Sequence, residues 1–380
     1  MFYLPMNLLK MLTSFLLFLS LFHFLTEARE ADLVLLHDSG EAVCLDGSPP
    51  GYYYRPGVGA DANNWILHLE GGGWCPNEDN CLDRSKGTLG SSKNWTQTTS
   101  FSGFLSDEQE YNPDFYQWNV VFLKYCDGAS FAGYVAEPVN VKGTNIYFRG
   151  FKILQLILQS VMDKGMSNAK EVILTGCSAG GLATYIHTNY VKSLLSPTVK
   201  FHAIADAGYF IDAPDVNGEW YIRTFYSDVF NMQNCSDGVN QDCIAAYKGT
   251  NETWKCFMAQ YTYPHISSPI FSFNSQVDTW QLVAILKLEC KPPNCTEEQM
   301  KQFFNFYEEF KKASEPIVSS TVNGAFLDSC LAHCQTLDNQ GWAVRSVQNQ
   351  TGATTFGNWY FERSGLKNIA DCSYPCNKSC

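Results

Sequence analysis

The sequence predicts an α/β fold in which a mostly parallel central sheet is flanked by helices. Short apolar runs, typical of buried strands, alternate with helical patterns along the chain beyond residue 28. One strand-to-helix junction, between Glu171 and Leu194, carries the motif G-x-S-x-G. Because the candidate site residues come from both halves of the chain, we expect residues 29–380 to form a single domain with loop and cap insertions.

The first 28 residues have the layout of a secretory signal peptide. Lys10 precedes an almost wholly apolar run, Met11–Leu25. The run is followed by Thr26, Glu27 and Ala28, which end in a small residue as a signal-peptide cleavage site does. The run is short for a membrane span, so we expect cleavage after Ala28 rather than a membrane anchor. No later stretch is long and apolar enough to cross a bilayer, and the sequence therefore predicts a secreted, soluble protein.

Fifteen cysteines agree with an oxidising compartment. Most fall in close groups, namely Cys75 with Cys81, Cys235 with Cys243, Cys290 with Cys295, Cys330 with Cys334, and Cys372 with Cys376 and Cys380. None has the C-x-x-C spacing of a zinc ribbon, so disulfides are expected and a metal is the weaker alternative. Since the number is odd, at least one thiol is left over, and we expect it to be Cys177, inside the G-x-S-x-G turn.

The net charge of −12 argues against nucleic acid as a partner, because phosphate binding needs a basic face. A strongly anionic substrate would likewise need a local basic patch, or a neutralised form of the substrate. Six N-x-S/T triplets are consistent with passage through a secretory pathway, at Asn94, Asn234, Asn251, Asn294, Asn349 and Asn377.

Upstream of the motif the chain predicts four strands and a helix. The strand runs are residues 33–36, 52–54, 65–69 and 118–125, and helical spacing covers residues 151–164. Between the third and fourth runs, residues 75–113 are polar, and we expect a long loop region that covers the site.

Three glycines, Gly71–Gly73, follow the predicted strand Trp65–Leu69 and Glu70. Glycines at the end of a strand let backbone N–H groups approach a substrate oxygen with no side chain in the way, as in half of an oxyanion hole. A flexible turn is the alternative. His68 lies inside the strand, so we expect a core residue there rather than a base.

The motif itself reads as a nucleophile elbow. A buried-strand run, Glu171–Thr175, leads into Gly176–Gly181, and helical spacing follows from Leu182. Such a sharp turn would hold Ser178 at a strained backbone angle that flanking glycines tolerate. The helix amino terminus would then lie behind Ser178, and the N–H of Ala179 would be free to point at an oxyanion. A structural glycine-rich turn is the alternative.

Downstream, residues 201–205 and 269–273 are predicted strands, and the aromatic-rich segment between them is long enough to form an inserted cap. Thr296 and Gln299 form a capping box that opens a further helix. The run Trp359–Phe361 reads as the last strand.

A serine hydroxyl needs a base to take its proton, and the base needs a carboxylate to fix its tautomer. In the elbow fold these groups follow the serine in the order acid, then histidine. Beyond the motif helix, His202 lies within a strand and His265 precedes the strand 269–273. His333 is therefore the predicted base.

The predicted acid is Asp278, which lies just past the strand 269–273, where the fold places a carboxylate. Asp206 also ends a predicted strand, and Asp328 is close to His333 in sequence. We prefer Asp278 and keep Asp206 as the likelier substitute.

Several separated stretches together resemble one known family, the plant pectin acetylesterases. They are Leu69–Cys75 (LEGGGWC), Gly176–Gly181 (GCSAGG), Asn274–Gln281 (NSQVDTWQ), Ala332–Cys334 (AHC) and Tyr374–Cys380 (YPCNKSC). That family is similar in turn to Notum, an animal carboxylesterase that acts on lipidated Wnt. Gly73 and Trp74, where Notum has an aromatic pair, and Cys177, where it has serine, favour the plant branch.

The resemblance implies an α/β-hydrolase-like fold and a serine esterase that needs no metal or other cofactor. The implied triad is Ser178, Asp278 and His333, with oxyanion donors at Gly72, Gly73 and Ala179. The implied substrate is acetylated pectin of the cell wall, chiefly its galacturonan, with no nucleic acid or membrane partner, and we expect a monomer. A Notum-like lipid carboxylesterase and a non-catalytic wall-binding protein remain alternatives.

Overall fold

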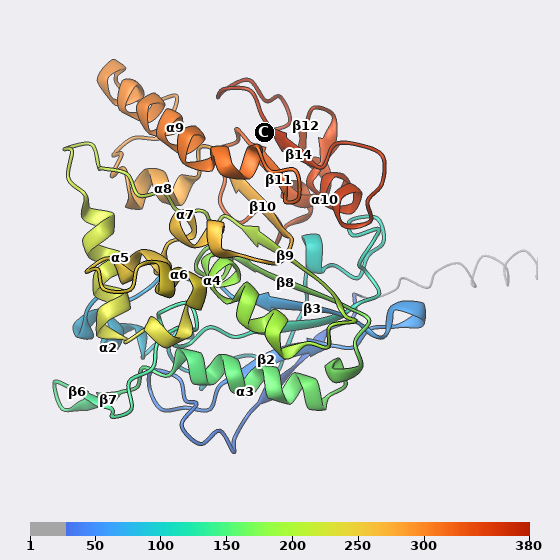
Figure 1. Ribbon diagram of the computed structural model, residues 1–380, viewed down its shortest axis with the longest axis vertical. Coiled ribbons are helices and arrows are strands. Elements are labelled where there is room, and N and C mark those ends of the chain that lie inside the picture. Colours follow the sequence, from blue (N-terminus) through green and yellow to red (C-terminus); the bar gives the residue numbers. More distant parts are fainter. Residues whose placement is uncertain (1–27) are drawn as a thin grey trace, which may run out of the picture.

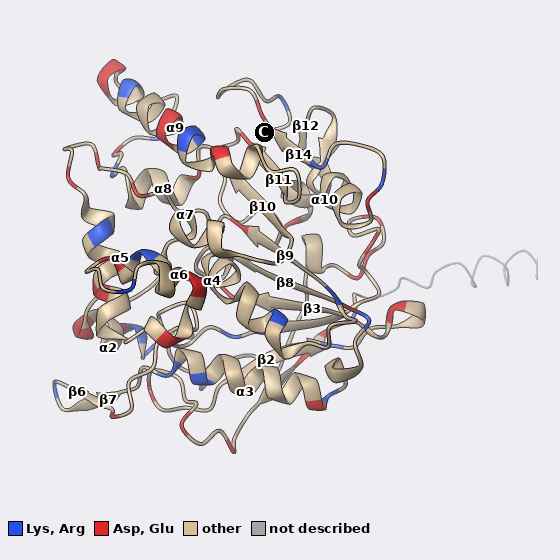
Figure 2. Ribbon diagram, viewed as in Figure 1, with Lys and Arg blue, Asp and Glu red and all other residues tan. Residues whose placement is uncertain are grey.

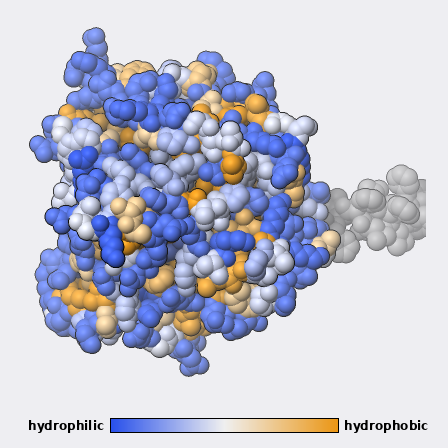
Figure 3. Space-filling model, viewed as in Figure 1, coloured by the Kyte–Doolittle hydropathy of each residue, from blue (hydrophilic) through white to orange (hydrophobic). Residues whose placement is uncertain are grey.

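The computed structural model describes residues 28–380, so all but the last residue of the predicted signal peptide lies outside the described part of the chain. Within that part, no helix combines the length and the apolar character that a membrane span requires. Acidic and basic residues are interspersed over the outer helices and loops (Figure 2), and apolar side chains appear only in separate patches on the face seen in Figure 3.

A sheet of ten strands crosses the molecule (Figure 1). In spatial order its strands are β14 (Asn368–Ala370), β11 (Gly324–Asp328), β10 (Ile270–Ser275), β9 (Lys200–Asp206), β8 (Glu171–Cys177), β3 (Asn64–Leu69), β5 (Asn119–Leu123), β2 (Gly51–Arg55), β1 (Ala31–Leu35) and β4 (Thr98–Thr99). The seven strands from β14 to β5 are parallel, and the remaining three continue the sheet in antiparallel pairs. The predicted mostly parallel sheet is confirmed.

Both faces of the parallel strands are buried, which explains why their sequences read as continuous apolar runs. Along β8, Val172 and Leu174 pack into one core cluster and Ile173 into a second on the opposite face. Helices α3 (Gly150–Asp163) and α4 (Ala179–Leu194) cover the first face, and α10 (Gly352–Tyr360) covers the second.

The remaining helices lie toward the carboxyl ends of the strands and around the sheet edge (Figure 1). They are α2 (Glu78–Arg84), α5 (Tyr221–Met232), α6 (Gln241–Ala246), α7 (Ala259–Thr262), α8 (Thr279–Ala284) and α9 (Glu297–Val318), and two small hairpins pair β6 (Val139–Val141) with β7 (Thr144–Ile146) and β12 (Ser346–Val347) with β13 (Gln350–Thr351). The predicted capping box of α9 is present, because the side chains of Thr296 and Gln299 each bond to the other residue's backbone N–H.

Two secondary-structure predictions are wrong. Trp359 and Tyr360 belong to α10, whose start is capped by Thr351, and the last strand is β14 instead. The segment 75–113 is not all loop, since it contains α2, which is capped by Asn77. The aromatic cluster in α10 packs against the sheet, and a packed aromatic run reads alike in a short helix and a strand.

Seven disulfides cross-link the described residues. They are Cys44–Cys126, Cys75–Cys81, Cys177–Cys334, Cys243–Cys256, Cys290–Cys295, Cys330–Cys380 and Cys372–Cys376. The prediction of a free Cys177 is wrong, and the free thiol is the buried Cys235. Disulfide bonding depends on residues that meet in space, so closeness in sequence finds only the short loops.

Candidate active site

The predicted site residues follow four strands of the parallel sheet, which are β3, β8, β10 and β11. Gly71–Gly73 follow β3, Ser178 follows β8, Asp278 lies three residues after β10, and His333 lies in the loop after β11. Because parallel strands all end at the same edge of a sheet, these segments gather at one edge. That edge faces the side of the molecule on which α5 and α8 lie (Figure 1).

Ser178 occupies a strained turn between β8 and α4. Its backbone angles are φ 59° and ψ −123°, a conformation that side-chain-bearing residues rarely adopt. The chain passes very close to β3 here, since a Cβ on Gly180 would lie 1.9 Å from the carbonyl oxygen of Leu69. The glycine is therefore required by close approach, and the strain presents the serine at the helix amino terminus.

His333 and Asp278 are in direct contact. Nδ1 of His333 lies 2.7 Å from Oδ2 of Asp278, and the carboxylate is buried while the imidazole is partly exposed. The other oxygen of Asp278 accepts from the N–H of Gln281 at 2.9 Å and caps α8. This second bond fixes the carboxylate, so the ring is held with Nε2 as its remaining nitrogen.

The histidine loop is joined covalently to the serine turn. The disulfide Cys177–Cys334, with a Cα–Cα distance of 5.4 Å, links the residue before Ser178 to the residue after His333. The two predicted reacting groups are thus held beside each other by a cross-link that spans 157 residues of sequence. This link contradicts the expectation that Cys177 is free.

Asp206, the alternative acid, contacts a different residue. Its Oδ2 accepts from both the N–H and the hydroxyl of Thr336, each at 2.7 Å, and its own carbonyl accepts from the N–H of Ser178 at 3.0 Å. Burial raises the pKa of Asp206 to about 7. Asp206 therefore holds the histidine loop and the serine turn in place, while Asp278 is the carboxylate that meets the imidazole. Asp328 is also buried, and its carboxylate accepts from the N–H of Cys330.

Two opposing effects act on His333. Burial lowers its pKa, whereas the hydrogen bond and charge of Asp278, together with Asp206, raise it, and the net result is a pKa above the ordinary 6.5. The pKa values of other buried histidines shift in the opposite direction, because burial lowers the pKa of His68 to about 3 and that of His187 to about 4. His68 lies inside β3 with no hydrogen bond to any described residue, as expected of a core residue.

The glycine loop after β3 leaves its amides free. Gly72 and Gly73 have φ of 139° and 68°, and neither N–H donates to any described residue. Their carbonyls are hydrogen-bonded instead. The carbonyl of Gly72 accepts from Arg84 and that of Gly73 accepts from the Tyr125 hydroxyl, each at 2.8 Å. The carbonyl of Gly72 shares its peptide plane with the N–H of Gly73, so the bond from Arg84 sets the direction of that amide before a ligand arrives.

The third predicted donor, Ala179, is the first residue of α4, so its N–H has no carbonyl partner within the helix. Its carbonyl accepts from the hydroxyl of Ser130 at 2.8 Å, and that hydroxyl accepts from the indole of Trp74 at 2.7 Å. The glycine loop and the helix amino terminus are therefore fastened to each other. Arg84, Tyr125 and Ser130 were not predicted from the sequence, because no motif marks them.

Aromatic side chains border the site. The ring of Trp280 stacks on His333 at 6.5 Å between centroids, and Trp74 meets Trp280 at 5.6 Å and Phe210 at 5.3 Å. Trp74 and Phe210 are almost fully buried. A reacting group that enters here meets an apolar wall, which strengthens electrostatic interactions within the site.

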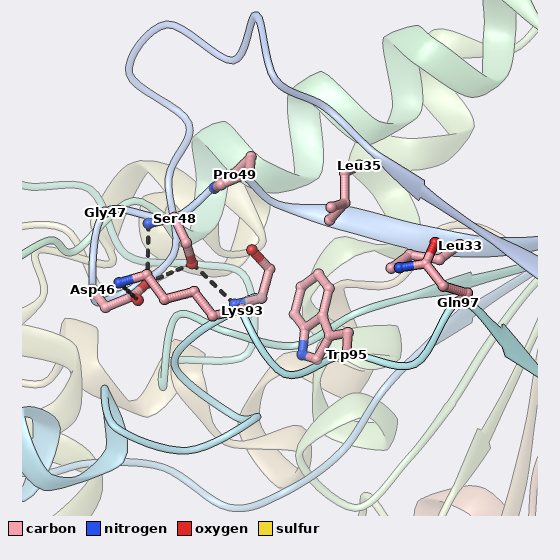
Figure 4. Close-up of a pocket in the computed structure, with 10 residues that line it drawn as sticks. Leu33, Leu35, Asp46, Gly47, Ser48, Pro49, Lys93, Trp95 and Gln97 are labelled. Atoms are coloured by element: carbon pink, nitrogen blue, oxygen red, sulfur yellow. Dashed lines mark hydrogen bonds and ion pairs between the residues drawn. The ribbon is translucent and has the colours of Figure 1, made fainter.

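Two other features of the described residues do not provide a comparable site. A pocket of about 350 Å³ is lined by Leu33, Trp95 and the turn 46–49, but its carboxylate, Asp46, is already bonded to Ser48 and Lys93 (Figure 4). The cluster of Asp371 with two nearby cysteines does not suit a metal, because both thiols are used in the disulfide Cys372–Cys376.

The raised pKa of His333 predicts how activity depends on pH. A base must be neutral to accept a proton, so we expect kcat/KM for a small acetyl ester to fall as pH drops, with a midpoint above 6.5. The contribution of the same group to stability has the opposite trend, being full below 6.5 and lost as pH rises through the folded-state pKa. A pH–rate profile with chemical denaturation at each pH measures both, and an acid limb well below 6.5 would contradict the assignment.

Comparison with known proteins gives a consistent family. The family model described as pectinacetylesterase matches residues 25–380. Pectin acetylesterase 5 of Arabidopsis thaliana is 39% identical over 354 residues, which are 89% of this chain and 82% of that protein. Pectin acetylesterase 11 of the same plant is 37% identical over 358 residues, 89% of either chain.

More distant similarity extends to animal proteins. The palmitoleoyl-protein carboxylesterase Notum of Mus musculus is 32% identical over 311 residues, which are 76% of this chain and 58% of that protein. The solved structure of the Wnt deacylase Notum from Drosophila has a TM-score of 0.82 at 23% identity and covers 93% of this chain and 100% of its own. This likeness confirms the predicted α/β-hydrolase-like fold.

Proposed function

Because this chain belongs to the pectin acetylesterase family, we propose that it is a secreted serine esterase that removes acetyl groups from pectin in the cell wall. Ser178 is the nucleophile, His333 the base and Asp278 the carboxylate that orients the base. The amides of Gly72, Gly73 and Ala179 bind the oxyanion. The single domain of residues 29–380 would be released after cleavage of the signal peptide.

The mechanism follows from the roles of these groups. Nε2 of His333 takes the proton of Ser178 as Oγ bonds to the acetyl carbonyl carbon, and the carbonyl oxygen becomes an oxyanion facing the free amides. The bond to the sugar oxygen then breaks, and His333 gives its proton to that oxygen. Water, activated by the same imidazole, attacks the acetyl-serine and releases acetate.

One observation carries the proposal. The imidazole that bonds to Asp278 at 2.7 Å sits on a loop that a disulfide joins to the residue before a strained serine. A structural serine at a turn would need neither the backbone strain nor an adjacent histidine–carboxylate pair. The amides of Gly72 and Gly73 support the same mechanism, since they make no hydrogen bond to the described residues and can therefore donate to an oxyanion.

Acetate release from acetylated pectin tests the substrate. We expect the wild-type protein to release acetate, and to prefer acetyl over octanoyl esters of the same alcohol by at least about tenfold in kcat/KM, which corresponds to roughly 1.4 kcal/mol. A strong octanoyl preference would favour a lipid carboxylesterase of the Notum kind. Pectin binding with no turnover of any ester, in correctly cross-linked protein, would favour a non-catalytic wall protein.

A further inference from the structure

We propose that four residues beside the site, Trp220, Tyr221, Arg223 and Lys287, form a platform that binds the carboxylate-bearing sugar units of an anionic polysaccharide. The inference rests on the proposed function, since it names how that site would hold a polymer rather than a small ester. It answers a difficulty of charge, because a protein of net charge −12 repels an acidic polymer unless a local surface attracts it.

The platform is connected to the site by an unbroken series of aromatic contacts. Trp280 stacks on His333, and Trp74 packs against Trp280. Phe225 of α5 then lies 6.3 Å from Trp74, and Tyr221 at the start of α5 lies 6.0 Å from Phe225, measured between ring centroids. Trp74 itself is almost fully buried, so these rings link the platform to the site through the interior rather than forming the surface that a polymer would touch.

The outer end of this series is exposed. Trp220 and Tyr221 expose 41% and 44% of their surface, which is unusual for large aromatic side chains. Sugar rings present faces of C–H groups that pack on aromatic rings, whereas an exposed aromatic pair with no ligand leaves apolar surface in water. Exposed rings linked to a site that would remove acetyl groups from a polysaccharide therefore suit a sugar chain.

Each ring carries a cation. The guanidinium of Arg223 lies 3.5 Å from the centre of the Trp220 ring, and Nζ of Lys287 lies 4.1 Å from the centre of the Tyr221 ring. Stacking of this kind orders a side chain that would otherwise be mobile. The loop before α5 and the end of α8 are joined directly, because the N–H of Val216 donates to the carbonyl of Leu286 at 2.9 Å.

The arrangement of the ion pairs turns positive charge outward. Arg223 pairs with Asp212 and Lys287 with Asp215, and in both pairs the cation is 42% exposed while the carboxylate is at most 2% exposed. Arg223 bonds to Asp212 through Nε alone, so its two terminal nitrogens make no hydrogen bond to the described residues. A free pair of guanidinium N–H groups fits a carboxylate in a bidentate manner.

The test compares an anionic polymer with a small neutral ester. We measure kcat/KM on acetylated polygalacturonate and divide it by kcat/KM on phenyl acetate. For the double variant Arg223→Gln/Lys287→Gln, we expect this ratio to fall about tenfold, mainly because KM for the polymer rises. Trp220→Ala should lower the same ratio. Arg223→Lys/Lys287→Arg keeps both charges and should restore most of it.

Matched controls exist elsewhere on the surface. Arg363 is 45% exposed, pairs with Asp114 and lies 4.6 Å over the ring of Phe361, so Arg363→Gln removes the same kind of group and should leave the ratio unchanged. Phe304 on α9, 39% exposed, is the control for Trp220. An unchanged ratio in the double variant, or an equal loss on both substrates, would overturn the proposal.

A binding measurement separates this inference from the proposed function. In the Ser178→Ala protein, calorimetry with unesterified polygalacturonate should give binding that weakens with added salt and weakens again in the double variant. If the wild type fails to deacetylate pectin, the proposed function fails, and this measurement still decides whether the platform exists. Absence of binding, or binding that neither salt nor the double variant alters, would contradict it.

Discussion

Replacing Ser178 with alanine should lower kcat for acetyl ester hydrolysis by about 10⁵- to 10⁶-fold, because removing the nucleophile of a serine hydrolase leaves only transition-state binding. The substitution removes one hydroxyl oxygen at a residue whose backbone angles are set by packing between β8, α4 and β3. We therefore expect the fold to persist. The measurement is acetate release from a small ester and from pectin, with circular dichroism on both proteins.

A serine on the same helix provides the control. Ser193 lies near the end of α4, is exposed, and donates only to the carbonyl of Tyr190. Ser193→Ala should retain full activity. Labelling by an organophosphate should modify Ser178 in the wild type and no residue in Ser178→Ala; turnover that survives Ser178→Ala would refute the serine mechanism.

Local signals in the sequence predict the strained turn at Ser178 and the glycine loop after β3. The strand, the glycines and the helix around Ser178 are contiguous, so pattern alone predicts that β8 passes through a sharp turn into α4. The order of residues along the chain predicts His333 and Asp278 as a pair, and the structure brings them into contact. The variants Ser178→Ala and Asp278→Asn test the catalytic roles of these residues.

Long-range features could not be predicted in this way. Cys177 pairs with Cys334 across 157 residues, and Cys330 pairs with Cys380, so the short spacing between Cys330 and Cys334 pointed to the wrong bond. Arg84 and Ser130 act through the backbone carbonyls of Gly72 and Ala179. Such contacts leave no residue pattern, because any donor of suitable reach could make them.

The same limit explains the missed strands. β11 is a short buried strand and its neighbour β14 has only three residues, so the aromatic run Trp359–Phe361 gives the stronger strand signal in the sequence. That run is apolar because α10 covers the sheet with rings, not because it lies within the sheet. Burial explains the apolar composition of this run, but the sequence alone does not show which part of the fold buries it.

Replacing Asp278 with asparagine should lower kcat by about 10⁴-fold with little loss of stability, as the known effect of this change in serine proteases suggests. Asparagine can keep the cap of α8, since its side-chain oxygen can accept from the N–H of Gln281 as the carboxylate does at 2.9 Å. Its amide nitrogen then faces Nδ1 of His333, so two donors meet and the imidazole adopts the tautomer that cannot accept the proton of Ser178.

Asp206→Asn is the comparison that decides between the two carboxylates. Its side-chain oxygen can still accept from the N–H and hydroxyl of Thr336, so we expect a loss of less than about tenfold. The pH profiles should differ as well: Asp278→Asn removes the largest influence that raises the pKa of His333, and its residual activity should extend to lower pH. The carboxylate that stabilises the imidazolium is the one whose loss lowers the rate most. A loss of about 10⁴-fold in Asp206→Asn with a mild effect in Asp278→Asn would therefore assign that role to Asp206.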